Sequence, residues 1–256
     1  MPVYRNGRHE HGQNFLTDPR HVSAIVSLVA DTEGPIVEIG PGSGALTLPL
    51  QRLGRPVTAV DVDAKLTAEL RKRVDASVTT VVTGDFLRHR LAPTPQVIVG
   101  NLPFHQTTAM LRHLLHAPGW TDAILLVQWE VARRRAAVGG ATMMTAQWWP
   151  WFTFELHGRV PAAAFTPRPG VDGGILVIRR RRKPLLAARE RKRYKAFVHG
   201  VFTGRGRGLA EILRKTTMAS PADARAFLDS RHLPRTALPK EPRADDWVAM
   251  YRRFGA

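Results

Sequence analysis

Ile36-Val37-Glu38-Ile39-Gly40-Pro41-Gly42-Ser43-Gly44 is the stretch that decides the fold, because a short run of strand-type residues ends in three closely spaced glycines. Glycines let a backbone turn sharply and approach a ligand at the carboxyl end of a parallel sheet. The spacing is G-x-G-x-G, whereas a dinucleotide fingerprint needs its third glycine one residue later, where Ala45 stands. The loop therefore predicts a nucleotide-type pocket and leaves NAD open as a weaker match.

Alternating strand and helix patterns extend outward from this loop, between Gly34 and Arg180. Such alternation predicts parallel strands joined by crossover helices. The predicted strands are 36–39, 57–60, 78–82, 97–99, 124–127, 152–156 and 175–178; the predicted helices are 45–53, 64–74, 107–115 and 131–137. A further helix over 19–29, capped by Asp18 or Thr17, precedes the sheet. The expected fold class is α/β, with a Rossmann-like, doubly wound, seven-stranded sheet.

The run Arg179-Arg180-Arg181-Arg182-Lys183-Pro184 ends the last predicted strand, and only helical patterns broken by Gly and Pro come after it. We predict a catalytic domain at 1–182 and a small α-helical domain at 183–256. Most of the net positive charge lies after nearly the same point. Residues 179–256 contain 21 Lys and Arg and 7 Asp and Glu, which gives +14 of the total +17. This asymmetry predicts a nucleic-acid partner, although a solvated helical face or a membrane-surface patch would have a similar composition.

Composition narrows the remaining classes of function. The sequence has no apolar run of the roughly 20 residues that a membrane span needs, and its first residues lack the apolar core of a signal peptide. We therefore expect a cytoplasmic protein. It contains no cysteine, which excludes disulfides and thiolate metal sites. We expect no metal and a monomer.

Polar residues come after successive predicted strands at the edge where the glycine loop lies. Asp61, about 20 residues after the loop, is placed to hold a ribose diol, and Asp85 comes after the next strand, where it can accept from an adenine amino group. Asn101 ends the fourth strand. Together these features predict S-adenosylmethionine as the cofactor, although each acid taken singly could be a surface carboxylate or a helix cap.

The segment Asn101-Leu102-Pro103-Phe104 suits chemistry on an exocyclic aromatic amine. Such a nitrogen is a poor nucleophile until its hydrogens are accepted by carbonyl oxygens, which the Asn101 side chain and a neighbouring backbone carbonyl can supply. Proline stiffens the turn, and the Phe104 ring offers a stacking surface for an extruded base. The alternative is an ordinary loop with good turn chemistry.

Five motifs, in order, resemble those of the rRNA adenine N6-methyltransferases. They are Gln13-Asn14-Phe15-Leu16, Glu38 to Gly44, Gly84-Asp85-Phe86, Asn101 to Phe104, and Val160-Pro161 to Phe165-Thr166-Pro167. The segment from Gln128 to Arg135, with Gly139 to Gln147 after it, is similar to the Erm group of antibiotic-producing bacteria, which acts on 23S rRNA. The KsgA/Dim group, which acts on the small subunit, usually has a different segment here.

The resemblance implies a class I methyltransferase sheet and assigns roles to matching residues. Asn14, Leu16, Gly40, Gly42, Asp61, Asp85 and Asn101 would bind the cofactor, and Asn101, Leu102, Phe104 and Phe165 would form the catalytic site. The family more often has Tyr at position 104, so its hydroxyl must be dispensable here. The predicted RNA-binding residues are Arg133, Arg134, Arg135, Arg179, Arg180, Arg181, Arg182, Arg205 and Arg207.

The resemblance further implies N6-methylation of an adenine in the peptidyl-transferase loop of 23S rRNA, with naked rRNA or an early assembly intermediate as the partner. The expected consequence is resistance to macrolide, lincosamide and streptogramin B antibiotics. Two alternatives stay open: a KsgA-like small-subunit dimethylase, and a non-catalytic nucleic-acid-binding factor on the same fold. The sequence does not decide between one methyl group and two.

Overall fold

The computed structural model describes residues 14–255, and the chain forms two compact units. One contains the segments Met1–Ala132 and Leu156–Arg179, and the other contains Arg133–Glu155 and Arg180–Ala256. We call them the sheet unit and the helical unit. The helical unit includes residues 133–155, whereas the predicted division at 182/183 places them in the catalytic domain. The assignment of separate functions to 1–182 and 183–256 stays a prediction.

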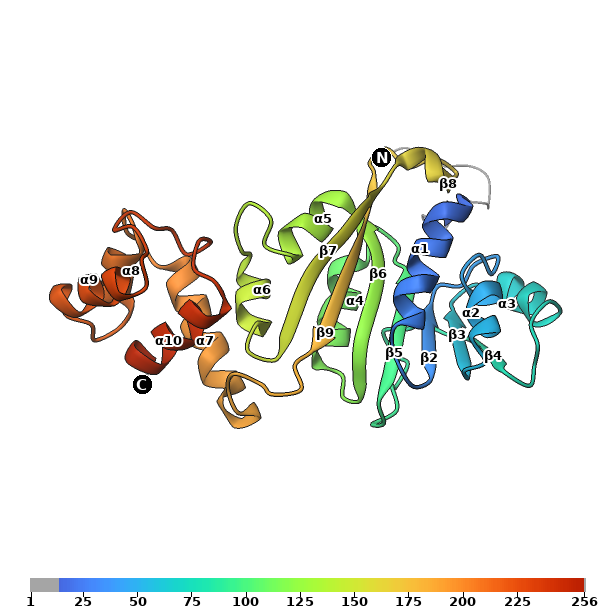
Figure 1. The fold of residues 1–256 in the computed structure, drawn as a ribbon, viewed down its shortest axis with the longest axis horizontal. Helices are drawn as coiled ribbons and strands as arrows, with labels where there is room; N and C mark the ends of the chain where they lie inside the picture. The colour runs from blue at the N-terminus through green and yellow to red at the C-terminus, as the bar shows by residue number, and fades with distance from the viewer. Residues whose placement is uncertain (1–13, 256) are drawn as a thin grey trace. The chain divides into compact units, whose positions relative to one another are not determined.

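A seven-stranded sheet forms the centre of the fold, in the order β4-β3-β2-β5-β6-β9-β7 (Figure 1). Its strands are β2 (Ile36–Ile39), β3 (Val57–Asp61), β4 (Thr79–Thr83), β5 (Gln96–Asn101), β6 (Trp120–Gln128), β7 (Phe152–Val160) and β9 (Gly173–Arg180). The strands from β4 to β6 run parallel in this order, and β9 pairs antiparallel with β6. The predicted seven-stranded sheet is confirmed.

The order of strands reverses between β2 and β5, because β3 and β4 lie on one side of β2 and β6 lies beyond β5. Ile39 pairs with Gly100 at this junction, so the loop after β2 emerges beside Asn101 at the end of β5. In open α/β sheets, ligands bind at such a reversal, beyond the carboxyl ends of the strands. The topology thus brings the glycine loop and Asn101 to one site.

Helices cover both faces of the sheet, with α1 in front and α4 behind in Figure 1. They are α1 (Pro19–Ala30), α2 (Thr47–Leu50) with the 3-10 turn η1 (Gln51–Leu53), α3 (Ala64–Arg71), α4 (Thr107–His116) and α5 (Trp129–Arg135). Asp18 caps α1, since its carboxylate accepts from the Arg20 and His21 amides at 2.8 and 3.3 Å. Ile25 and Val29 of α1 are buried against Ile36 and other strand residues.

Two very short strands join distant parts of the chain. β1 (Phe15–Leu16) pairs antiparallel with β8 (Phe165–Thr166), which comes after the turn η2 (Ala162–Ala164). The Thr17 amide also donates to the Ala164 carbonyl at 2.8 Å. The first and last of the five sequence motifs are therefore neighbours in space.

The helical unit has its own core of aromatic residues. Its elements are α6 (Met143–Trp148), η3 (Ala188–Glu190), α7 (Arg191–Thr203), α8 (Leu209–Thr216), α9 (Pro221–Ser230) and α10 (Ala244–Phe254). Tyr194 packs edge-on against Trp151 and Tyr251, with ring centroids 5.7 and 5.3 Å apart. The Arg191 guanidinium lies 5.2 Å from the Trp148 ring and 5.1 Å from the Trp151 ring, which ties α7 to the end of α6. No helix among residues 14–255 is long and apolar enough to span a membrane.

Candidate active site

A pocket lies where β2 and β5 end. Gly100 permits the close approach of these strands, because a Cβ there would stand 2.5 Å from the Ile39 carbonyl oxygen. The pocket is lined from the start of β1, the glycine loop, and the end of β5 with the segment after it. The lining residues are Asn14, Phe15, Gly40, Asn101, Leu102, Pro103 and Phe104. Three of the five sequence motifs thus contribute to a single pocket.

The glycine loop and Asp61 are locked together. Gly40 and Gly42 have φ values of 65° and 53°, which disfavour any side chain. A Cβ on Gly42 would also stand 2.6 Å from the Phe15 ring. The Gly42 amide donates to Asp61 Oδ2 at 3.0 Å, and Oδ1 of this buried carboxylate accepts from the Asp63 amide at 3.0 Å. Asp61 therefore holds the glycine loop in its conformation and also lies at the edge of the sheet where a ligand would bind.

Glu38, inside the glycine motif, is a buried acid to which the sequence assigned no separate role. It is 1% exposed, and its Oε2 finds no hydrogen-bond partner in the described part of the chain. Burial raises the pKa of Glu38 to about 8; the nearby Thr47 partly opposes this rise, and the negative charge of Asp61 adds to it. Buried polar atoms without partners are uncommon, so this corner of the loop is suited to a bound polar group.

Asp85 and Val62 lie at the ends of the next strands. Asp85 Oδ1 accepts from the Leu87 amide at 2.9 Å, while its side chain stays 41% exposed and can accept a further hydrogen bond. Val62 separates Asp61 from Asp63 and is 52% exposed, although it is apolar. Val62 was not predicted as a site residue, because its only signal in the sequence is an apolar residue between two acids at a strand end.

Asn101 is held in one orientation. Its side-chain Nδ2 donates to the backbone carbonyl of Asn14 at 2.6 Å. Because that bond occupies the nitrogen end of the amide, Oδ1 is the end left to accept. Leu102 contributes through its backbone alone, since its side chain is buried and its amide donates to the Leu126 carbonyl at 2.9 Å.

Phe104 and Phe165 lie beside each other. Their ring centroids are 6.4 Å apart and their planes differ by 72°. The turn before Phe165 is held by Asp172, which accepts from the Ala162 amide at 2.8 Å and from Arg159 Nε at 2.7 Å. The Ala162 amide, with help from Arg159, lowers the pKa of Asp172, so this anchor stays ionised. The two predicted stacking residues therefore lie together, with Phe165 held by a braced turn.

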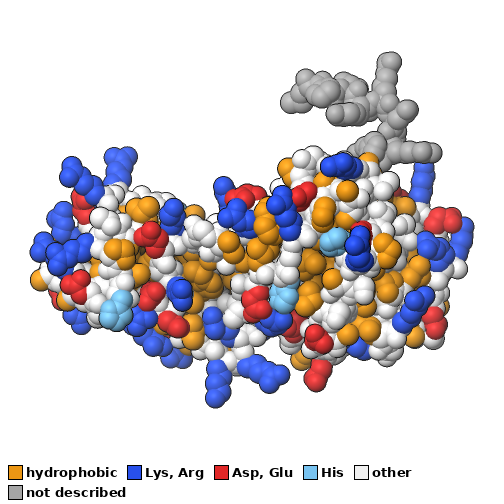
Figure 2. Space-filling model, turned by 45° about the horizontal axis from the view of Figure 1, so that its top comes forward, with side chains coloured by type: hydrophobic (Ala, Val, Ile, Leu, Met, Phe, Trp, Pro, Cys, Tyr) orange, Lys and Arg blue, Asp and Glu red, His pale blue; other side chains and the backbone are white. Residues whose placement is uncertain are grey.

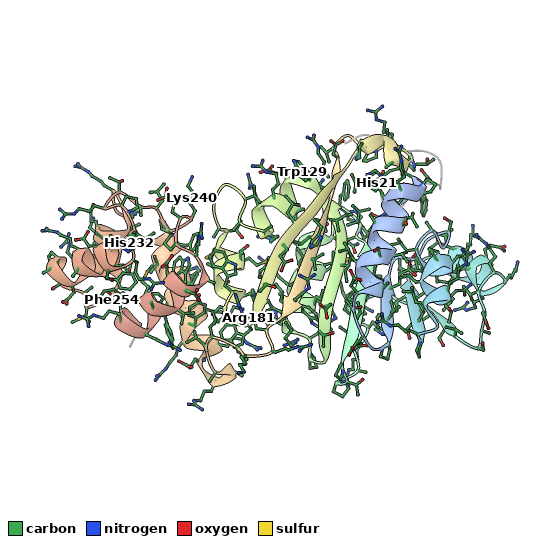
Figure 3. The ribbon with its side chains drawn as sticks, in the orientation of Figure 1. His21, Trp129, Arg181, His232, Lys240 and Phe254 are labelled. Atoms are coloured by element: carbon green, nitrogen blue, oxygen red, sulfur yellow. The ribbon has the colours of Figure 1, made fainter. Side chains whose placement is uncertain are left out.

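Several predicted RNA-binding arginines make contacts within the protein. Arg135 Nη1 donates to the Thr142 hydroxyl at 2.8 Å, and Arg179 lies 3.5 Å from Asp122. The Arg180 guanidinium covers the Phe152 ring at 4.8 Å. Arg181, labelled in Figure 3, donates from Nε to the Trp149 carbonyl at 2.8 Å. Arg134, Arg182, Arg205 and Arg207 are exposed, and Arg133 is half-buried. Contact of these residues with RNA stays a prediction.

The pocket fits the cofactor that the sequence predicts. The buried Asp61 carboxylate at the end of β3 complements a ligand with positive charge, and the glycines let that ligand lie close to the backbone. Among residues 14–255, no cluster of three or more His, Asp or Glu side chains could hold a metal ion. The arrangement is suited to binding a cationic nucleoside next to an amide oxygen and two aromatic rings.

The chain is similar over most of its length to known rRNA methyltransferases. A family model described as ribosomal RNA adenine dimethylase matches residues 4–254. An rRNA adenine N-6-methyltransferase of Corynebacterium diphtheriae is 62% identical over 84% of this chain and 85% of its own length. The mycinamicin-resistance protein MyrB of Micromonospora griseorubida is 46% identical over 97% of this chain and 79% of its own. The crystal structure of the 23S rRNA methyltransferase ErmE is 31% identical and superposes with a TM-score of 0.87, covering 95% of this chain and all of that one.

Proposed function

The chain belongs to the ribosomal RNA adenine dimethylase family, and from this premise we propose that it methylates N6 of one adenine in 23S rRNA. The observation that carries the proposal is the hydrogen bond from Asn101 to Asn14, because it leaves an oxygen acceptor beside two aromatic rings at the cofactor pocket. Relatives named for 23S rRNA and for mycinamicin resistance favour this substrate over the small subunit.

S-adenosylmethionine, when bound, supplies an electrophilic methyl group. Gly40, Gly42 and Asn14 would line its methionine portion, and Asp61 its ribose. Asp85 would accept from its adenine amino group, with Val62 against the ring as the exposed apolar surface at that edge. Leu16, which is buried in β1, would act by keeping Asn14 in place.

Asn101 activates the target amine. Its Oδ1 and the Leu102 carbonyl oxygen accept the two amino hydrogens of the adenine, which turns the nitrogen lone pair out of the ring. No general base is needed at this stage, since the amine becomes acidic only as the new N–C bond forms and its proton then passes to solvent. Positioning and fixed acceptors supply most of the barrier reduction.

Phe104 and Phe165 hold the extruded adenine. Extrusion from the RNA stack costs a few kcal/mol, which stacking on an aromatic ring offsets in part. Because the two ring planes differ by 72°, a base that stacks on one ring meets the other at its edge. Neither contact needs a hydroxyl at position 104.

We further place the enzyme in the cytoplasm as a monomer that acts on naked 23S rRNA or an early assembly intermediate. The predicted RNA-binding arginines and the +14 charge of residues 179–256 would contact phosphates rather than read bases. The target would lie in the peptidyl-transferase loop. Its methylation would block macrolide, lincosamide and streptogramin B binding.

The test offers naked 23S rRNA and small-subunit particles in parallel, with labelled S-adenosylmethionine. We expect label in one adenine of 23S rRNA, and mass spectrometry of that nucleoside counts its methyl groups. Label confined to the small subunit would instead support a KsgA-like enzyme. No binding of the cofactor in calorimetry would support the non-catalytic alternative.

A further inference from the structure

A groove on the helical unit combines cations with apolar and aromatic side chains. It runs between α7, the turn from α8 to α9, and the last turn of α10. The lining residues that matter here are Arg193, Phe197, Lys215, Met218, Arg253 and Phe254. None of them belongs to the pocket at the end of β5. Figure 2 shows many Lys and Arg side chains over this unit, at the left.

The cations of the groove have N–H donors available for an anionic ligand. Lys215 Nζ lies 2.5 Å from Glu211, and Arg253 Nη2 lies 3.0 Å from Asp223. Each of these two side chains has further N–H donors beyond the one used. Within residues 14–255, the exposed Arg193 guanidinium has no hydrogen bond or ion pair. Three cations face one lining carboxylate, so the groove attracts anions.

The aromatic side chains form a firm surface for a flat ligand. Phe197 packs edge-on against Trp247 and Tyr251, at 6.3 and 5.8 Å between centroids, and Phe254 does so against Phe227 at 5.4 Å. Both phenylalanines keep part of their surface exposed (Phe254 is labelled in Figure 3). Met218, across the groove in the α8–α9 turn, is fully exposed. Together with the exposed parts of Phe197 and Phe254, Met218 gives the groove a continuous lining of apolar side chains.

We propose that this groove binds an unpaired RNA nucleotide, with its phosphate at Arg193 and Lys215 and its base against Phe254 and Met218. Ring faces and cations side by side are what sequence-tolerant recognition of single-stranded RNA requires. An apolar peptide would use the rings and leave the cations unpaired, whereas a double helix would use the cations and leave the rings exposed. The inference rests on the proposed function, which supplies RNA as the substrate, and adds a second RNA site outside the catalytic pocket.

The test compares Arg193→Glu with Lys192→Glu in the full chain. Lys192 is exposed on the same helix, carries the same charge and does not line the groove, so it is a matched control. Affinity for a fluorescent, unstructured RNA oligomer is measured by anisotropy at several salt concentrations. We expect Arg193→Glu to weaken binding about tenfold or more and Lys192→Glu to weaken it less than about threefold. Phe254→Ala should weaken binding about fivefold with little change in salt dependence, since it removes a stacking surface and no charge.

The outcomes separate this inference from the proposed function. Calorimetric binding of S-adenosylmethionine should be the same in all three variants as in the unaltered protein, which shows that the variants fold. Equal RNA affinity for Arg193→Glu and Lys192→Glu would overturn the inference while leaving methyl transfer intact. A change in sedimentation of the protein alone, with unchanged RNA affinity, would also overturn it and assign the groove to a second copy of the chain. Absence of methyl transfer by the unaltered protein would contradict the proposed function instead.

Discussion

The buried acid Glu38 makes the stability of the protein depend on pH in an unusual direction. Its pKa is raised from 4.5 to about 8 by burial, so the folded state holds a proton that the unfolded state loses near pH 4.5. Because the unfolded chain binds fewer protons than the folded one in this range, the free energy of unfolding falls as pH rises. The contribution of Glu38 therefore falls between pH 4.5 and 8 and is level above that range. From about pH 5 to about pH 7.5 the loss amounts to about 3 kcal/mol for a shift of this size.

Glu38→Gln removes this titration while keeping the shape of the side chain. The free energy of unfolding, measured with urea at several values between about pH 5 and about pH 7.5, should fall less steeply for the variant than for the unaltered chain. The difference should approach about 3 kcal/mol at the upper end of this range. Glu69→Gln is the control, because that carboxylate is exposed and makes a surface pair with Lys72. Parallel pH profiles for Glu38→Gln and the unaltered chain would refute the reasoning.

Three further predictions concern the site and the sheet unit. Asn101→Ala should lower kcat about 100-fold or more with cofactor affinity less affected, measured by steady-state kinetics and calorimetry, because it removes a fixed acceptor. Gly42→Ala should weaken cofactor binding about tenfold or more in calorimetry, since the added Cβ would stand 2.6 Å from Phe15 and strain the positive φ. Arg55→Ala should cost about 2 kcal/mol and lower Tm by several degrees. Its guanidinium donates to the carbonyls of residues 29, 32 and 34, whereas Arg52→Ala, at an exposed neighbour, should leave Tm nearly unchanged.

The elements that sequence predicted well are those with a repeating pattern. All seven sheet strands overlap the ranges predicted from runs of strand-type residues, and α1 begins after Asp18 as its cap chemistry predicts. The predicted helix at 45–53 is a shorter α2 followed by η1, because Pro49 and the left-handed Gly54 limit it. β1, β8 and the six-residue α6 were not predicted, since two residues show no periodicity and β1 pairs with a partner far along the chain.

The sequence predicted which strand ends carry the site residues, but not how the side chains pack around the glycine loop. Motif spacing placed Asp61, Asp85 and Asn101 at successive strand ends, where the structure has them. The unpartnered Oε2 of Glu38 and the exposure of Val62 depend on how the glycine loop packs, which no spacing reveals. The contact of Arg181 with the Trp149 carbonyl was not predicted either. A run of basic residues in the sequence indicates charge but does not indicate which groups those residues contact in the fold.

The pairing of β1 with β8 also determines when, during synthesis, the site of this protein can form. Thr17 bonds to Ala164 across 147 positions of the chain, so β1 has no strand to join until the ribosome has synthesised β8. Until then the Asn14 carbonyl is not anchored, and the amide of Asn101 has no fixed partner. A nascent chain that has already completed β2 to β6 thus possesses most of its sheet without an organised reaction centre. Catalytic competence arrives late in synthesis, after the emergence of the segment around Phe165.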